Sequence, residues 1–269
     1  MLLLVDLDGV VYRGQQPVPG VAPLLRRRAD GGDRVIFVTN NSSRHRDDYR
    51  AHLEQLGLPA DADSIVTAAR ATAVLLAGRD PRPRAVMVLG GPGLAHELRD
   101  EGLRVVPPTE RGLAADADAV CVGVDFRLTY RRLSITAGTV RRGALFVATN
   151  RDPVYPAADG ELLAGAGAMV AAVATAAGRQ PDITVGKPEP RLFEAAAEIA
   201  GMPVAEAIVI GDNLFSDIAA ARAVGARSIL MLTGVTTPGM VATLPDAERP
   251  TAIARDAEEL AARLRELAS

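Results

Sequence analysis

Carboxylate side chains end two short apolar runs of this 269-residue sequence. Asp6 ends the run LLLVD and Asp8 follows two residues later, while Asp212 ends the run AIVIGD. Ligands of α/β proteins bind outside the carboxyl ends of the strands, so these three residues are the first candidates for a site. Asp8 and the glycine after it also fit an ordinary turn, so this pair alone does not decide between a structural and a functional role.

The three carboxylates together predict a bound cation. Like charges about 4 Å apart repel by roughly 4 kcal/mol at an effective dielectric near 20. Oxygen ligands without His or Cys point to a hard ion, and one or two carboxylates with a substrate phosphate are typical of Mg²⁺. We therefore expect Mg²⁺ near Asp6, Asp8 and Asp212.

A third run, RVIFVT, ends at Thr39 and continues into Asn40, Asn41 and two serines. A helix is expected from Arg44, and backbone N–H groups and the helix dipole favour an anion at a helix start. Capping of that helix by one of the serines is an equally good interpretation and is compatible with it. The whole set describes a site for a phosphorylated substrate.

Short apolar strands alternating with helices must position these residues. Near-continuous apolar runs predict parallel strands covered on both faces, which is an α/β fold with a doubly wound parallel sheet. The expected strands are 2–6, 34–39, 64–68, 85–90, 119–124, 144–149, 207–212 and 227–232.

Two stretches rich in Pro, Gly and Arg predict the domain organisation. LAGRDPRPRA at 76–85 and AAGRQPDIT at 176–184 both have the composition of inter-domain connections, and three strands lie between them. We expect a small α/β domain, 79–181, inserted into a discontinuous first domain made of 1–78 and 182–269.

Composition excludes several partners. A net charge of −3, 3% aromatic residues and the absence of Trp argue against nucleic acid. The amino-terminal apolar stretch is too short for a signal or spanning segment, so we expect a soluble, cytoplasmic protein without a membrane partner. Cys121 is expected to be a buried structural thiol, and His45 and His52 to be surface residues of one helix rather than metal ligands.

Four ordered motifs resemble those of the haloacid dehalogenase superfamily of phosphatases: DLDGVVYRG, VTNNSS, VGKPEP and GDNLFSDI. The subgroup is the one with NagD-type and nitrophenylphosphatase-like enzymes. VGVDFRLTYRRL, ATNRDPVYP, GELLAGAGAM and LTGVTT also match, so the resemblance spans nearly the whole chain. It implies a Rossmann-like core and an inserted α/β cap of the C2 type.

The resemblance implies a role for each motif residue. Asp6 is the implied nucleophile that forms an aspartyl-phosphate, and Asp8 the acid and base for the leaving alcohol and the water. Mg²⁺ is held by Asp6, the main-chain carbonyl of Asp8 and Asp212. The supporting residues are Gly9, Asn213 and Asp217.

Phosphate binding is implied for Thr39, Asn40 and main-chain amides near Asn41, with Lys187 neutralising the nucleophile and the phosphate. Lys187 is the one lysine among 30 basic residues. Its compact ammonium fits a crowded crevice better than the planar fork of arginine, which favours a functional reason for the choice.

The inserted domain is implied to close over the crevice and select the substrate. Its candidate specificity loop holds Asn150, Arg151, Asp152 and Tyr155. The segment GGPGLA at 90–95 also invites a dinucleotide interpretation, but its glycine pattern is incomplete and no acidic residue follows at the expected place.

The expected function is Mg²⁺-dependent hydrolysis of a small phosphorylated metabolite, such as glycerol phosphate, phosphoglycolate, a sugar phosphate or a nucleoside monophosphate. Asp8 favours phosphoryl transfer over dehalogenation. The alternative is a non-hydrolytic phosphate-binding or phosphoryl-accepting regulatory protein on the same fold. Related proteins often pair through their caps, so a homodimer is also possible.

Overall fold

The computed structural model describes residues 1–113, 116–156 and 161–268. Gly160, where the matched stretch GELLAGAGAM begins, lies outside the described residues. The chain divides into a first unit, made of 1–39, 47–66 and 187–269, and a second unit, made of 40–46 and 67–186. These limits differ from the predicted ones, because the second unit also takes segment 40–46 and helix α3 (Ala68–Ala77). The assignment of the two parts as core and cap stays a prediction.

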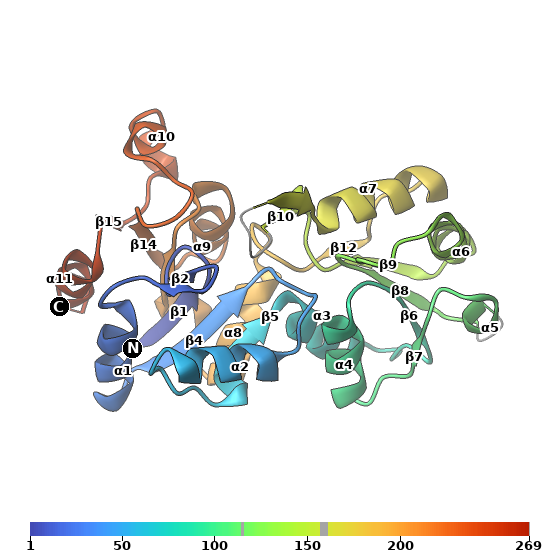
Figure 1. Ribbon diagram of the computed structural model, residues 1–269, viewed down its shortest axis with the longest axis horizontal. Coiled ribbons are helices and arrows are strands. Elements are labelled where there is room, and N and C mark those ends of the chain that lie inside the picture. The colour runs from blue at the N-terminus through green and yellow to red at the C-terminus, as the bar shows by residue number, and fades with distance from the viewer. Residues whose placement is uncertain (114–115, 157–160, 269) are drawn as a thin grey trace. The chain divides into compact units, whose positions relative to one another are not determined.

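A parallel sheet with the strand order β15-β14-β13-β1-β4-β5 forms the centre of the first unit (Figure 1). Strand β1 pairs in parallel with β4 on one side and with β13 on the other. The carboxyl ends of these three neighbouring strands therefore lie at the same edge of the sheet. The strands are β1 (Leu2–Asp6), β4 (Arg34–Thr39), β5 (Ile65–Thr67), β13 (Ile208–Gly211), β14 (Arg227–Met231) and β15 (Ala252–Ala254).

Every residue of β1 is buried, as the continuous apolar run predicted. Leu3 and Val5 pack in one cluster with side chains of α1 (Val21–Asp30), α2 (Arg46–Gln55) and α11 (Ala257–Glu266). The other elements of this unit are β2 (Tyr12–Arg13), β3 (Gln16–Pro17), α8 (Arg191–Ala200), α9 (Ala219–Ala223), α10 (Pro238–Ala242), the π-helix η3 (Leu214–Ile218) and the 3₁₀ turns η1 (Ala62–Ser64), η2 (Val204–Glu206) and η4 (Asp246–Glu248).

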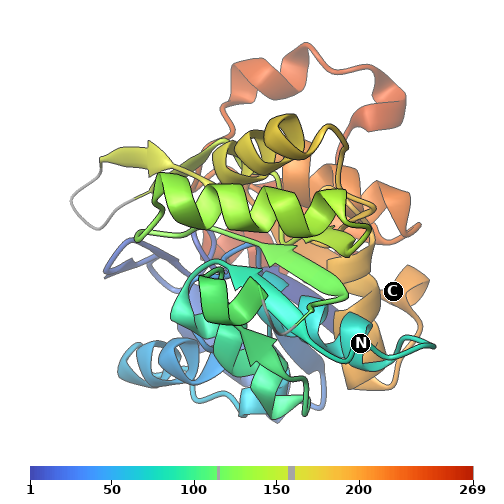
Figure 2. The ribbon, with the colours of Figure 1, turned by 90° about the vertical axis from the view of Figure 1, so that its right-hand side faces the viewer.

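The second unit has its own parallel sheet, in the order β12-β9-β8-β6-β7. Helices α6 and α7 lie over one face of this sheet and α3 and α4 over the other (Figures 1 and 2). The antiparallel pair β10 and β11 is separate from it. The elements are β6 (Val86–Leu89), β7 (Val105–Val106), β8 (Ala119–Val122), β9 (Leu145–Ala148), β10 (Val154–Pro156), β11 (Leu162–Ala164), β12 (Ile183–Thr184), α4 (Pro92–Asp100), α5 (Glu110–Leu113), α6 (Tyr130–Arg141) and α7 (Ala166–Ala177).

All eight predicted strands are present, but the sequence prediction missed others. The inserted sheet has five strands rather than three, because β7 and β12 contain only two residues each and give no apolar run. Strand β12 lies within the stretch that was expected to be a connection.

Two predictions about the segment after β4 are wrong. Helix α2 begins at Arg46 rather than Arg44, and the carboxylate of Glu97 accepts the N–H of Arg46. His45 is buried, with 7% of its surface exposed, because it precedes the helix instead of lying on its polar face.

Cys121 is fully buried in β8, as expected, and burial raises the pKa of its thiol. Within the described ranges, the structure contains no helix that is both long and apolar enough to cross a membrane.

Candidate active site

Three carboxylates meet at the carboxyl edge of the first unit's sheet. Asp6 ends β1. Because Val5 pairs with Ile210, Asp6 lies level with the last residue of β13, and Asp212 follows that residue in the chain. Carboxylate oxygens of Asp6, Asp212 and Asp217 lie within 4.8 Å of one another. All three residues are buried, with at most 8% of their surface exposed.

The π-helix η3 turns Asp217 back toward this edge. It begins after Asn213, whose side chain accepts the N–H of Phe215 over 2.9 Å, and the N–H of Asn213 donates to Asp217 Oδ2 over 3.1 Å. A Cβ on Gly211 would lie 2.2 Å from Cβ of Asp217, so only glycine leaves room there. Asp217 was predicted only as a supporting residue, whereas the structure places it within the carboxylate group itself.

Lys187 lies between two of the carboxylates, with Nζ 2.5 Å from Asp6 Oδ1 and 2.6 Å from Asp217 Oδ1. It is 3% exposed. Burial alone would lower the pKa of Lys187, but the charges of Asp217 and Asp6 and the two hydrogen bonds raise it above its ordinary value, so the ammonium stays charged. If all three carboxylates are ionised, this group of four carries two excess negative charges.

The pKa values of the carboxyl groups reflect that imbalance. Burial raises the pKa of Asp6 well above its ordinary value, and the charges of Asp217 and Asp212 act in the same direction against Lys187. Burial, followed by the charge of Asp217, raises the pKa of Asp212 to about 6. Such shifts mark a place where ionised carboxylates lack positive charge, and a bound cation would supply it.

Two glycines allow the close approach of backbone to Asp212. Gly9 has a φ of +82°, which favours glycine, and a Cβ there would lie 2.5 Å from Asp212 Cγ. A Cβ on Gly234 would lie 1.8 Å from Asp212 Oδ2, and this same oxygen accepts the N–H of Val235 over 2.7 Å. Thr233 Oγ1 donates to the carbonyl of Gly9 over 2.6 Å and joins the two loops.

Residues 233–235 belong to the matched stretch LTGVTT, for which the sequence suggested no role. Their contribution could not be read from the sequence, since it depends on how close the chain passes to Asp212. The structure adds Gly234 and Val235 to the residues that shape the site.

Asp8 is more accessible than the three carboxylates. Desolvation by the surrounding chain nevertheless raises the pKa of its carboxyl above the ordinary value, while the N–H of Gly9 and the charge of Arg13 oppose the shift. Thr39 ends β4, and because Val38 pairs with Asp6 it lies beside the end of β1. Thr39 belongs to the first unit, whereas segment 40–46 belongs to the second.

Asn40 contacts the predicted specificity loop within the second unit. Its side-chain amide donates to Asp152 Oδ2 over 3.0 Å, and the amide of Asn150 donates to the carbonyl of Asn40 over 2.7 Å. Arg151 bonds instead to Gln180 over 2.7 Å, and the ring of Tyr155 packs edge-on against Phe126. The structure therefore groups Asn150 and Asp152 with Asn40, while Arg151 and Tyr155 contact other residues.

The parallel sheet, with carboxylates and Lys187 at its carboxyl edge, agrees with the family motifs. A family model described as haloacid dehalogenase-like hydrolase matches residues 3–104. A second, described as HAD-hydrolase-like, matches residues 184–260. The chain belongs to the haloacid dehalogenase-like hydrolases, which confirms the resemblance and the predicted enzyme class.

Its relatives are phosphatases. The chain is 40% identical over 258 residues to D-glycerol 3-phosphate phosphatase of Mycobacterium tuberculosis, an alignment that covers 96% of this chain and 70% of the relative. Glycerol phosphate phosphatase from M. tuberculosis, solved in complex with magnesium, has a TM-score of 0.85 at 39% identity and covers 96% of this chain and 75% of its own. The p-nitrophenyl phosphatase from Archaeoglobus fulgidus has a TM-score of 0.88 at 30% identity, with 97% and 98% covered.

Proposed function

We propose that this chain hydrolyses small phosphomonoesters with Mg²⁺ and that Asp6 is the nucleophile. The observation that carries the proposal is the position of Asp6 at the end of β1, with Lys187 at 2.5 Å from its carboxylate and two further carboxylates beside it. A buried lysine neutralises the nucleophile, and with a cation it can neutralise the phosphate as well.

The donor set fits Mg²⁺. Every side-chain ligand on offer is a carboxylate oxygen, which suits a hard divalent ion, and two excess negative charges match its charge. Asp6, the main-chain carbonyl of Asp8 and Asp212 would hold the ion, with Asn213 and Asp217 beside them. When bound, Mg²⁺ supplies Lewis-acid stabilisation of charge on the phosphoryl oxygens. The magnesium complex of the M. tuberculosis relative supports this choice.

The reaction then has two steps at Asp6. A carboxylate oxygen of Asp6 attacks phosphorus, the bond to the ester oxygen breaks, and Asp8 gives its proton to the leaving alcohol. Asp8 next takes a proton from water, the water oxygen attacks phosphorus, and the bond to Asp6 breaks to release inorganic phosphate. The raised pKa of Asp8 favours the protonated form that the first step needs.

Phosphate binding is proposed for Thr39, Asn40 and the amides near Asn41, together with Lys187. The names of the relatives favour glycerol phosphate and related short phosphomonoesters as substrates. A substrate-selecting role for the second unit, a homodimer and a cytoplasmic location stay predictions.

Release of phosphate from p-nitrophenyl phosphate in Mg²⁺, compared with the same assay in EDTA, tests the proposal. We expect steady turnover that EDTA abolishes. Phosphorylation of the protein in a single stoichiometric burst, without turnover, would favour the regulatory alternative instead. A panel of phosphorylated metabolites ranked by kcat/KM then identifies the substrate.

A further inference from the structure

Segment 40–46, which carries Asn40 and Asn41, packs against the amino end of α4 in the second unit. The N–H of Gly93 donates to the carbonyl of Ser43 over 3.0 Å. A Cβ on Gly91 would lie 2.8 Å from Cα of Ser43, and one on Gly93 would lie 2.2 Å from the carbonyl carbon of Arg44. Gly91 and Gly93 of the stretch GGPGLA thus permit this close packing. The packing gives GGPGLA a structural role in place of dinucleotide binding.

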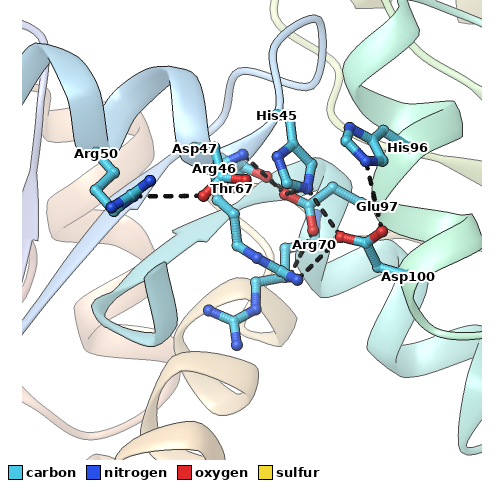
Figure 3. Close-up of polar contacts among 9 residues, drawn as sticks. All are labelled: His45, Arg46, Asp47, Arg50, Thr67, Arg70, His96, Glu97 and Asp100. Carbon is cyan, nitrogen blue, oxygen red and sulfur yellow. Dashed lines mark hydrogen bonds and ion pairs between the residues drawn. The ribbon is translucent and has the colours of Figure 1, made fainter. Parts of the chain in front are cut away.

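A buried carboxylate on the same helix holds the end of the segment (Figure 3). Glu97 is 0% exposed, and its two oxygens accept the backbone N–H of Arg46 over 2.9 Å and the guanidinium of Arg46 over 2.7 Å. The second arm of that guanidinium donates to Asp100 over 3.1 Å. Burial raises the pKa of Glu97, while Arg46, His45 and Arg70 act against the shift.

His45, His96 and Asp100 lie close enough together to suggest a metal site, but their geometry fits a cluster of ion pairs and hydrogen bonds better. His45 Nε2 lies 3.0 Å from Asp100, and His96 Nε2 lies 3.6 Å from it. The two rings are stacked, with centroids 3.9 Å apart and planes 24° from parallel. An imidazole nitrogen binds a metal in the plane of its ring, and stacked rings do not direct their nitrogens at one common point, so this arrangement does not favour a shared ion. Asp100 also accepts from Arg46, which already balances its charge.

Arg46 lies close in sequence to the residues proposed to bind phosphate, and hydrogen bonds hold the segment that joins them. Asn41 Oδ1 accepts the N–H of Ser43 over 2.7 Å and its hydroxyl over 2.8 Å, and Ser42 Oγ lies 3.0 Å from Thr149 Oγ1. Hydrogen bonds therefore hold the segment at residues 41–43 and again at Arg46. A shift at Arg46 would be transmitted to the amides near Asn41 over only five residues.

We infer that Glu97 is a positioning residue, which acts through Arg46 to hold Asn40 and the main-chain amides near Asn41 in place for the phosphoryl group. This inference rests on the proposed function, in which those amides bind phosphate. Glu97 has no direct part in the proposed chemistry.

Glu97→Gln in the full chain tests the inference, because it removes the charge while keeping an oxygen for the N–H of Arg46. We expect KM and the inhibition constant of inorganic phosphate to rise about ten-fold, the equivalent of about 1.4 kcal/mol, while kcat changes less. Arg46→Lys, which cannot reach Glu97 and Asp100 together, should shift both constants in the same direction.

Asp118→Asn is the matched control. Asp118 also accepts two backbone N–H groups and pairs with Arg84 over 3.0 Å, but it precedes β8, at the opposite end of the strands from segment 40–46. It should leave KM and phosphate inhibition unchanged. Amide hydrogen exchange of segment 40–46 should speed up in Glu97→Gln and not in the control.

Unchanged KM and phosphate inhibition in Glu97→Gln would overturn the inference, and so would an equal change in the control. If Glu97→Gln does not fold, Arg46→Lys decides by the same constants. A wild-type chain without turnover would contradict the proposed function instead, and hydrogen exchange would then show whether Glu97 holds the segment.

Discussion

Replacing Asp212 by Asn removes one negative charge from the carboxylate group at the ends of β1 and β13. The amide oxygen of Asn can still accept the N–H of Val235, which donates to Asp212 over 2.7 Å, so the shape and this hydrogen bond are kept. The substitution therefore separates the charge of Asp212 from its structural role.

The magnitude follows from the pKa of about 6 that burial and Asp217 give to Asp212. The difference from an ordinary aspartate pKa of about 3.9 corresponds to about 3 kcal/mol. Because the folded pKa is raised, the folded state binds more protons than the unfolded state between about pH 4 and 6. Metal-free stability therefore falls as pH rises through that window and stays lowered above it.

Thermal unfolding at pH 7.5, in EDTA and in Mg²⁺, measures the effect. In EDTA, Asp212→Asn should be more stable than the wild type by about 1 to 3 kcal/mol, which raises Tm by roughly 2–8 °C. In Mg²⁺ at 100 times its Kd, the wild type should gain about 2.7 kcal/mol, whereas the variant should gain little. The difference in Tm between the variant and the wild type should then shrink or change sign.

The exposed residue Asp246 offers a control in the same unit, since its side chain is 93% exposed and pairs with Arg249 on the same turn. Asp246→Asn should change stability by less than about 0.5 kcal/mol in either condition. A variant of Asp212 that is less stable than the wild type in EDTA, and that gains as much from Mg²⁺, would refute the reasoning.

Four further outcomes are expected. Asp6→Asn should abolish steady turnover while the far-UV circular dichroism stays that of the wild type, and near-normal turnover would exclude Asp6 as the nucleophile. Gly234→Ala should weaken Mg²⁺ activation, measured as the Mg²⁺ concentration for half-maximal rate, because its Cβ would lie 1.8 Å from Asp212 Oδ2; an unchanged value would show that the loop moves without cost. Below about pH 6, protons should compete with Mg²⁺ for Asp212, so the Mg²⁺ requirement measured by titration should rise as pH falls, and a flat profile would contradict the raised pKa. Lys187→Arg should lose most of kcat, and retention of the wild-type rate would show that the lone lysine has no special role.

The sequence predicted the strands of the site well because their apolar runs are long and end in polar residues. β1, β4 and β13 were expected within a residue or so of their observed limits, and the rule that ligands bind at the carboxyl ends of strands singled out Asp6, Thr39 and Asp212. The like charges and oxygen ligands of these residue types then indicated a bound cation.

Contacts that depend on tertiary packing could not be predicted in the same way. Asp217 lies in the carboxylate group because a π-helix adds a residue to the turn, which no periodic pattern reveals. His45 is buried because it packs against Glu97 and Asp100 of α4. These two residues are more than fifty positions away in the chain, so the sequence pattern around His45 does not reveal the contact. The glycines at 91, 93 and 234 are understood only from the backbone or side chain that each one faces.

Charge balance explains why the group needs both Lys187 and a divalent ion. Lys187 bonds to Asp6 and Asp217, while the backbone N–H of Val235 donates to Oδ2 of Asp212. The ammonium offsets one of three charges, and a divalent cation offsets the other two. Arginine in place of Lys187 would leave that sum unchanged, so any loss of activity must come from the size and shape of the guanidinium between two oxygens at 2.5 and 2.6 Å. The substitution therefore tests geometry alone, whereas Asp212→Asn tests charge alone, and the two variants should fail in different ways: the first in kcat and the second in its response to Mg²⁺.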